Sequence, residues 1–161
     1  KPTIALAHGK TMGGGLGLLA ACDIVYAADD ASFCFAEVKV GITPSTISPY
    51  VVAAIGERYT KYYFLTGESF DVKQAQHIGL VHNIMPTVNL VEYGLKLAVL
   101  MQQNSLPAMM AAKELVREVA AEPINIGPRS MTAMHLAKLR KTADAQEGLQ
   151  AFIEKRKPRW K

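Results

Sequence analysis

Residues 11–23 read TMGGGLGLLAACD, with three consecutive glycines directly ahead of an apolar run and a fourth glycine inside it. Glycine costs up to about 1 kcal/mol per residue inside a helix, so a glycine cluster where a helix begins needs a physical reason. One reason is a tight strand-to-helix turn that packs closely against a neighbour. The other is close approach of a ligand, because the first N–H groups of a helix have no intrahelical acceptor and the helix dipole adds partial positive charge there.

A dinucleotide-binding fingerprint is the first specific candidate, because GLGLLA at residues 15–20 fits the pattern G-x-G-x-x-A. That fingerprint requires a long crossover helix and an acidic residue roughly 20 residues further along the chain. Here Asp23 interrupts the apolar run early, and Asp29 and Asp30 come too soon. The spacing therefore argues against a dinucleotide site.

The order of the predicted elements indicates the fold class. Short apolar and β-branched runs predict strands at residues 3–7, 23–27, 32–38 and 80–85. Capping and stop residues predict helices at residues 14–22, 43–55, 57–66, 71–79, 88–102, 105–121 and 128–141, and from 144 onward. This pattern is typical of the second half of an α/β domain followed by a helical extension. Because the sequence opens at Lys1 directly before a strand, we expect that an upstream part is missing.

The composition excludes several classes of protein. The chain has 161 residues, of which 50% are hydrophobic, enough for one core, and no apolar run approaches the roughly 18 residues of a membrane span. Cys22 and Cys34 stand in apolar surroundings and predict buried thiols, which fit a reducing, cytoplasmic location. The histidines show no ligand spacing, so no metal is expected, and no G-x-S-x-G elbow provides a hydrolase nucleophile.

A basic segment, EKRKPRWK at residues 154–161, ends the chain, whose net charge is +4. A solvated tail is the usual explanation of such a run. Contact with a phosphate-bearing partner is the alternative, whereas the run alone is weak support for nucleic acid. We expect neither a nucleic-acid nor a membrane partner.

Several motifs together resemble the crotonase superfamily, the enoyl-CoA hydratases and isomerases. They are the glycine triplet at 13–15, CDI at 22–24, F-x-x-x-E at 33–37, G-x-x-P at 41–44 and EGLQAFIEKRKP at 147–158. The resemblance covers essentially the whole chain but only the C-terminal part of the family domain. It implies a crotonase-like ββα core over residues 1–86, and a helical extension over 87–161 that builds a homotrimer or a dimer of trimers. The implied substrate is an acyl-CoA thioester, and no separate cofactor is needed because CoA is part of that substrate.

The resemblance also implies roles for individual residues. Gly14 matches the position whose N–H forms one half of an oxyanion hole, and Glu37 matches a catalytic carboxylate. Without the family, Glu37 would be interpreted as a strand-end carboxylate that pairs with Lys39. Gly17 stands where two-carboxylate hydratases place their other glutamate. Predicted substrate-binding residues are Gly13, Gly15, Gly17, Pro44, Ser45 and Thr46.

One carboxylate leaves the reaction open. In hydration two carboxylates can share the work, since one holds the water and the other relays the proton. A single base instead suits an isomerase that moves a proton from Cα to Cγ. The segment GITPSTISPYVVAAIGERYTKYYFLTGESFDV at residues 41–72 nevertheless resembles bacterial methylglutaconyl-CoA-hydratase-like members, which also carry glycine at this position. In such a site a substrate carboxylate or a hydroxyl of Ser45 or Thr46 would place the water. We therefore expect a hydratase, with a single-glutamate isomerase or a non-catalytic oligomerisation fragment as alternatives.

Overall fold

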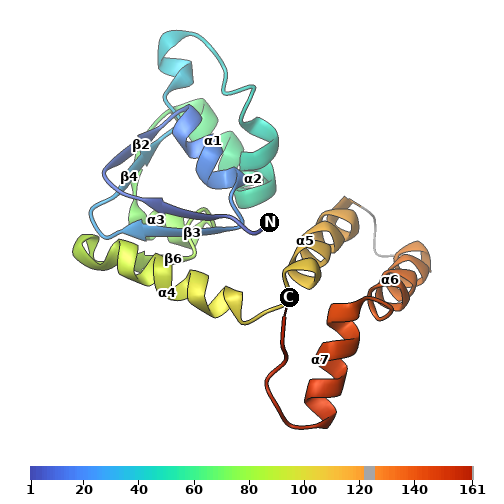
Figure 1. Ribbon diagram of the computed structural model, residues 1–161. Helices are drawn as coiled ribbons and strands as arrows, with labels where there is room; N and C mark the ends of the chain where they lie inside the picture. Colours follow the sequence, from blue (N-terminus) through green and yellow to red (C-terminus); the bar gives the residue numbers. More distant parts are fainter. Residues whose placement is uncertain (122–125, 161) are drawn as a thin grey trace. The chain divides into compact units, whose positions relative to one another are not determined.

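A computed structural model describes residues 1–121 and 126–160 of the chain, drawn in Figure 1. It divides into two compact units. The sheet unit is Thr3–Ala98, and the helical unit combines Lys1–Pro2 with Val99–Lys161. The domain boundary predicted at 86/87 stays a prediction.

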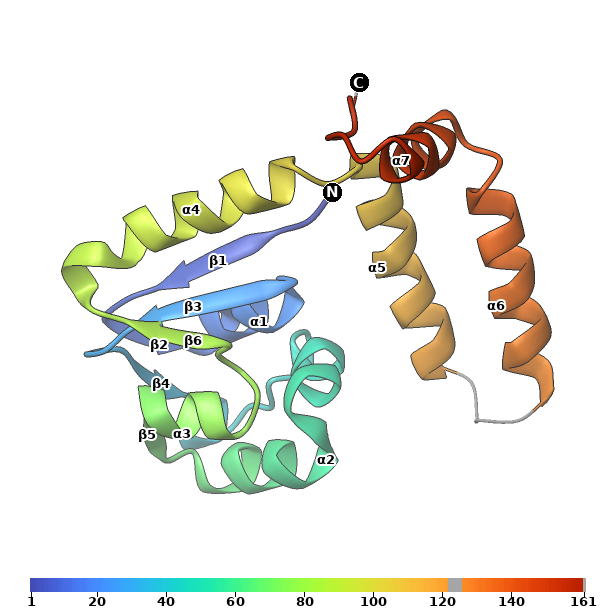
Figure 2. The same cartoon turned by 90° about the horizontal axis from the view of Figure 1, so that it is seen from below.

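Two small sheets form the framework of the sheet unit. The first has the order β1-β3-β6, all parallel, built from Ile4–Ala7, Ile24–Ala28 and Asn83–Met85. The second has the order β2-β4-β5, built from Lys10–Met12, Ser32–Cys34 and Ser69–Asp71, with β5 antiparallel to β4. Figure 2 shows the strands of the first sheet side by side. Parallel strands are buried on both faces, which explains why β1 and β3 read as continuous apolar runs rather than alternating ones.

Helices cover the sheets and complete the core. Helix α1 (Gly14–Ala21) follows β2 and packs against α2 (Ser48–Thr66), as Figure 1 also shows. Helix α3 is Val72–His77, and the sheet unit also holds the short 3₁₀-helices η1 (Glu37–Val40) and η2 (Thr87–Asn89). The largest fully buried side chains are Phe33, Phe35, Leu16, Leu80, Val25, Val51 and Val81. These residues come from strands, helices and the loops after β4 and α3, so one core joins the elements that carry the glycine-rich turn.

The remaining helices are α4 (Leu90–Gln102), α5 (Leu106–Ala121), α6 (Ile126–Leu139) and α7 (Ala143–Ile153). Helix α4 begins in the sheet unit, where Gly94 lets it approach β1: an ideal Cβ there would lie 2.8 Å from Leu6. In the helical unit, α5 packs against α6 and α7. The Ser105 hydroxyl just before α5 bonds to Asp144 of α7 at 2.5 Å.

The sequence-based elements agree with the structure in order and type, with three differences. The strand predicted over 32–38 ends at Cys34, and Glu37 lies in η1, because the partner strand β5 pairs no further than Cys34. The helix predicted to open at Thr43 begins at Ser48. The predicted stop at Gly56 is confirmed, because its φ of 72° and ψ of 164° are non-helical and interrupt α2 before it continues to Thr66. Strands β2 and β5 are only 3 residues long each and were not predicted.

No helix among the described residues is long and apolar enough to cross a membrane. Cys34 is buried and Cys22 half-buried, and both are free thiols, as predicted. The cytoplasmic location inferred from them stays a prediction.

Candidate active site

The glycine triplet forms the open start of helix α1. Gly13 is the N-cap, with φ 51° and ψ −122°, and its N–H donates to the Cys34 carbonyl at 3.2 Å. This bond fixes the turn to the end of β4. Gly14 is the first helical residue, so its N–H has no acceptor within the helix. An ideal Cβ on Gly14 would meet nothing within 4 Å, so a ligand atom has room to approach this backbone.

Glu37 reaches the same turn from η1, which follows the end of β4. Its backbone is held by the turn that follows, because its carbonyl accepts hydrogen bonds from the N–H groups of Gly41 and Ile42. Its Oε1 lies 3.3 Å from the position that a Cβ of Gly13 would take. Its Oε2 is buried and has no hydrogen-bond partner. A buried carboxylate oxygen left unpartnered is costly, and such a group needs an explanation in function or strain.

The alternative role of Glu37 as a structural ion-pair partner is not realised. Within residues 1–121 and 126–160 no ion pair joins Glu37 and Lys39, and the Lys39 Nζ lies instead 3.9 Å from the Cys34 Sγ. The carboxylate therefore stands beside the positive end of α1, where the helix dipole favours negative charge.

Close packing explains two glycines of the cluster, and the approach of a ligand at Gly14 stays a prediction. An ideal Cβ on Gly15 would lie 3.1 Å from the Thr11 Cγ2, and one on Gly17 would lie 2.1 Å from the Ile47 Cγ2. Close packing thus accounts for Gly15 and Gly17, whereas Gly14 faces open space. A substrate contact at Gly13, Gly15 or Gly17 stays a prediction. No local sequence signal predicts the role of Ile47, because Gly17, which it contacts, lies thirty positions earlier in the chain.

The turn at residues 43–47 carries the other predicted substrate-binding residues. Pro44 is buried, whereas Ser45 and Thr46 are exposed. The Ser45 hydroxyl shares a 2.6 Å hydrogen bond with the Thr43 hydroxyl. No contact given for the described part of the chain links these hydroxyls to Glu37, so their role in placing water also stays a prediction.

A cavity of about 880 Å³ lies elsewhere in the sheet unit, between α2 and the segment from Glu68 to His77. Its wall includes Tyr59 and Tyr63, and the Tyr59 hydroxyl meets the His77 Nε2 at 3.3 Å. Burial raises the pKa of the Tyr63 hydroxyl. Neither Gly14 nor Glu37 lines this cavity, so it is separate from the glycine-rich turn.

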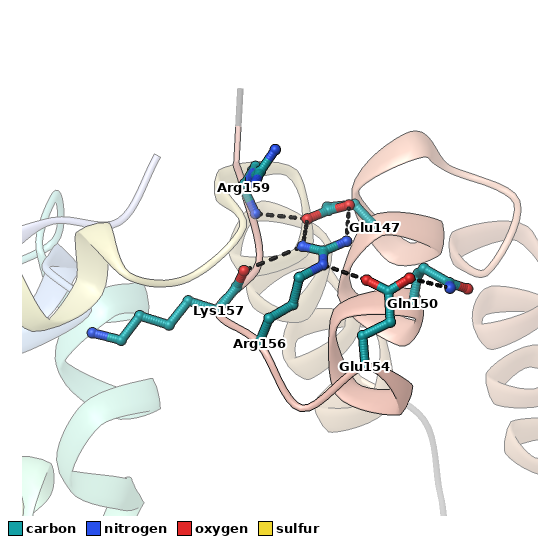
Figure 3. Close-up of polar contacts among 6 residues, drawn as sticks. All are labelled: Glu147, Gln150, Glu154, Arg156, Lys157 and Arg159. Atoms are coloured by element: carbon teal, nitrogen blue, oxygen red, sulfur yellow. Dashed lines mark hydrogen bonds and ion pairs between the residues drawn. The ribbon is translucent and has the colours of Figure 1, made fainter.

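The basic segment at the end of the chain is tied down within the helical unit, as Figure 3 shows. The Arg156 guanidinium bonds both carboxylate oxygens of Glu147 at 2.6 and 3.0 Å, and the Arg159 N–H donates to the same carboxylate at 2.8 Å. These donors hold the pKa of Glu147 at about 2. The Trp160 Nε1 donates to the Gln103 carbonyl at 2.5 Å. The described part of the tail is therefore anchored rather than freely solvated, and Lys161 lies outside the described residues.

Among the described residues no three histidine, cysteine, aspartate or glutamate side chains gather where they could hold a metal ion. At the glycine turn the structure places one carboxylate, that of Glu37, beside the N-terminal backbone donors of α1.

Comparisons with known proteins find a family match and several relatives. A family model described as enoyl-CoA hydratase/isomerase matches residues 1–161. A 2,3-dehydroadipyl-CoA hydratase of Escherichia coli is 33% identical over 162 residues, covering 100% of this chain and 63% of that protein. A mitochondrial Δ(3,5)-Δ(2,4)-dienoyl-CoA isomerase of Dictyostelium discoideum is 34% identical over 163 residues, covering 100% of this chain and 55% of that protein.

A solved structure gives the same result for the fold. The crystal structure of an enoyl-CoA hydratase from Shewanella pealeana superposes with a TM-score of 0.94 at 38% identity, covering 99% of this chain and 60% of that one. The crotonase fold is thus shown. The chain spans less than two thirds of the length of each of these three proteins.

Proposed function

The chain belongs to the enoyl-CoA hydratase/isomerase family, and from this premise we propose that it carries the catalytic carboxylate and one oxyanion donor of an enoyl-CoA hydratase-type lyase. One observation carries the proposal: the Glu37 carboxylate meets the glycine turn at Gly13, while the neighbouring Gly14 is the first residue of α1, so its N–H has no acceptor within the helix. A general acid/base and a donor for a developing oxyanion are the two groups that enolate chemistry requires.

In the proposed reaction the thioester carbonyl oxygen accepts a hydrogen bond from the Gly14 N–H. Water oxygen adds to Cβ, the electron pair of the double bond moves through Cα into the carbonyl, and an enolate forms. The Glu37 carboxylate takes a proton from the attacking water and delivers a proton to Cα, which restores the carbonyl and leaves Glu37 ionised. The Gly14 N–H contributes because negative charge on the carbonyl oxygen exists only in the enolate-like transition state.

Isomerisation of a 3-enoyl thioester is the second candidate, favoured by a specific observation. The space beside Gly17 is filled by Ile47, so a single carboxylate serves the turn. In that reaction Glu37 takes a proton from Cα, the double bond moves from the β,γ to the α,β position, and the proton returns at Cγ. The carboxylate again ends ionised.

Replacement of Glu37 by Gln in the full-length protein tests the proposal. Loss of the carboxylate should lower turnover of a 2-enoyl-CoA by about 100-fold or more, as expected for a general acid/base, with folding unchanged. Glu57→Gln is the matched control, since Glu57 is exposed and pairs with Lys61 on the surface of α2. Full activity of Glu37→Gln would refute the assignment, and formation of an isomerised product without any hydroxyacyl-CoA would establish the second candidate instead.

A further inference from the structure

The N-terminus of α2 fills the space beside Gly17. An ideal Cβ at Gly17 would lie 2.1 Å from the Ile47 Cγ2, 2.7 Å from its Cβ and 3.7 Å from its Cα. Ile47 is the residue before α2 begins and is 9% exposed, so its side chain is fixed in the contact between α1 and α2. Any side chain at position 17 therefore requires that Ile47 move.

This contact lies close to the catalytic carboxylate. Glu37 meets α1 at Gly13, and Gly17 follows four residues later, a rise of about 6 Å along the helix. The Glu37 carboxylate meets this helix at Gly13, the N–H without an intrahelical acceptor belongs to Gly14, and the Ile47 side chain meets it at Gly17. All three thus lie along the first turns of α1. An isoleucine offers water no hydrogen bond, so it cannot hold a water molecule as a carboxylate would.

We infer that Ile47 is a specificity-determining residue, which keeps a second carboxylate out of the site and leaves Glu37 to carry every proton transfer alone. The inference rests on the proposed function, which makes Glu37 the acid/base. A base that acts alone readily takes a proton from Cα and returns it at Cγ. In hydration the same carboxylate must also orient the attacking water oxygen toward Cβ while it removes a proton, a task that a second carboxylate would share. Ile47 therefore sets the ratio of hydration to isomerisation.

The steric part of the inference is tested by melting temperatures of the full-length protein. Gly17→Ala should lower the melting temperature, because the added methyl overlaps Ile47. Combining Gly17→Ala with Ile47→Ala should restore part of the lost melting temperature, measured against Ile47→Ala alone, because the Cβ of residue 47 at 2.7 Å remains. Combining it with Ile47→Gly should restore more, because only the Cα at 3.7 Å remains. Gly14→Ala serves as the control for stability, since its Cβ would meet nothing within 4 Å. Additive effects of the two substitutions would overturn the inference.

The chemical part is tested with Gly17→Glu alone and combined with Ile47→Gly. We expect the combined variant to raise the ratio of hydration to isomerisation by about 100-fold over the wild type, the range of one general acid/base group. An unchanged ratio in a folded double variant, or a Gly17→Glu protein as stable as the wild type, would overturn the inference. If the double variant does not fold, the melting-temperature series still decides it. Activity retained by Glu37→Gln would refute the proposed function. The steric contact between Gly17 and Ile47 would then still be tested by the melting temperatures of the Gly17 and Ile47 variants.

Discussion

The Glu37 carboxylate packs against the backbone of Gly13: a Cβ at Gly13 would lie 3.3 Å from the Glu37 Oε1, and the φ of Gly13 is +51°. A contact of this length is tighter than ordinary van der Waals packing, so any side chain at position 13 would push the carboxylate. The backbone conformation of Gly13 also favours glycine. The glycine turn therefore constrains the position of the Glu37 carboxylate.

Gly13→Ala should accordingly impair catalysis more than folding alone explains. Strain at such a backbone position costs about 1 to 3 kcal/mol, and displacement of the carboxylate should lower kcat by about 100-fold with a smaller change in KM. Gly9→Ala is the matched control, since Gly9 has φ +61° and a Cβ there would meet nothing within 4 Å. Steady-state kinetics and melting temperatures of both variants provide the test. Equal losses of kcat in the two variants would contradict a positioning role for Gly13.

The order of the helices and strands could be predicted from the sequence, because caps and apolar runs within each element indicate its type. The Asp71 cap illustrates this: its side chain accepts from the Gln74 N–H at 2.8 Å, and α3 begins at the next residue, as the capping rule requires. Buried parallel strands such as β1 were equally visible as short apolar runs.

The features that the sequence left undetermined depend on contacts between distant segments. Strand β4 ends where β5 stops pairing, and that limit follows from Gly67, which closes α2 with φ 58° just before β5. Likewise, the sequence does not show which glycines of the cluster are needed for close packing. The contact between Ile47 and Gly17 assigns Gly17 to packing. Residue roles at Gly14 and Glu37 came from resemblance to a family, because neither composition nor spacing distinguishes an oxyanion donor from an ordinary helix start.

Gly14→Pro should remove the proposed oxyanion donor while preserving the helix. Proline lacks an N–H, and it is well tolerated as the first residue of a helix, which is where Gly14 stands. Loss of one oxyanion donor typically lowers kcat by about 100- to 1,000-fold. We expect that loss with little change in melting temperature, measured on the full-length protein with a 2-enoyl-CoA.

Gly14→Ala distinguishes the donor from simple crowding. It keeps the N–H and adds a methyl group where nothing lies within 4 Å. Its kcat should fall far less than that of Gly14→Pro. Equal losses in both variants would show that the space beside Gly14 matters rather than its N–H.

The full-length protein should form a homotrimer, or a dimer of trimers. Helix α4 supports this expectation, because Val88 before it and Val91 and Leu95 within it are 91%, 63% and 63% exposed. Apolar side chains spaced in this way form one stripe, which is typical of a surface covered by a partner subunit. Light scattering coupled to size-exclusion chromatography measures the mass directly, and a stable monomer at micromolar concentration would contradict the prediction.

Acid should release the C-terminal segment from α7. The pKa of Glu147 in the folded chain is about 2, against an ordinary value of 4.5, because Arg156 and the Arg159 N–H both donate to the carboxylate. A lowered pKa means that the stabilisation is fully present above the ordinary value and is lost as the pH falls toward 2. Glu147→Gln removes the ionised acceptor at every pH. Its melting temperature should therefore lie below that of the wild type at pH 7, and the gap should close between pH 4.5 and 2.

Trp160 reports this release locally, since it is the chain's single tryptophan and its ring lies 3.1 Å from the Cβ position of Gly148. Its fluorescence should become more accessible to a soluble quencher in Glu147→Gln at pH 7, and in the wild type only as the pH approaches 2. Glu57→Gln, which breaks a surface pair with Lys61, should change neither signal. The anchoring bonds require the carboxylate of Glu147 in its charged form. If the difference in melting temperature between wild type and Glu147→Gln stayed constant down to pH 2, the ionised Glu147 would not anchor the segment.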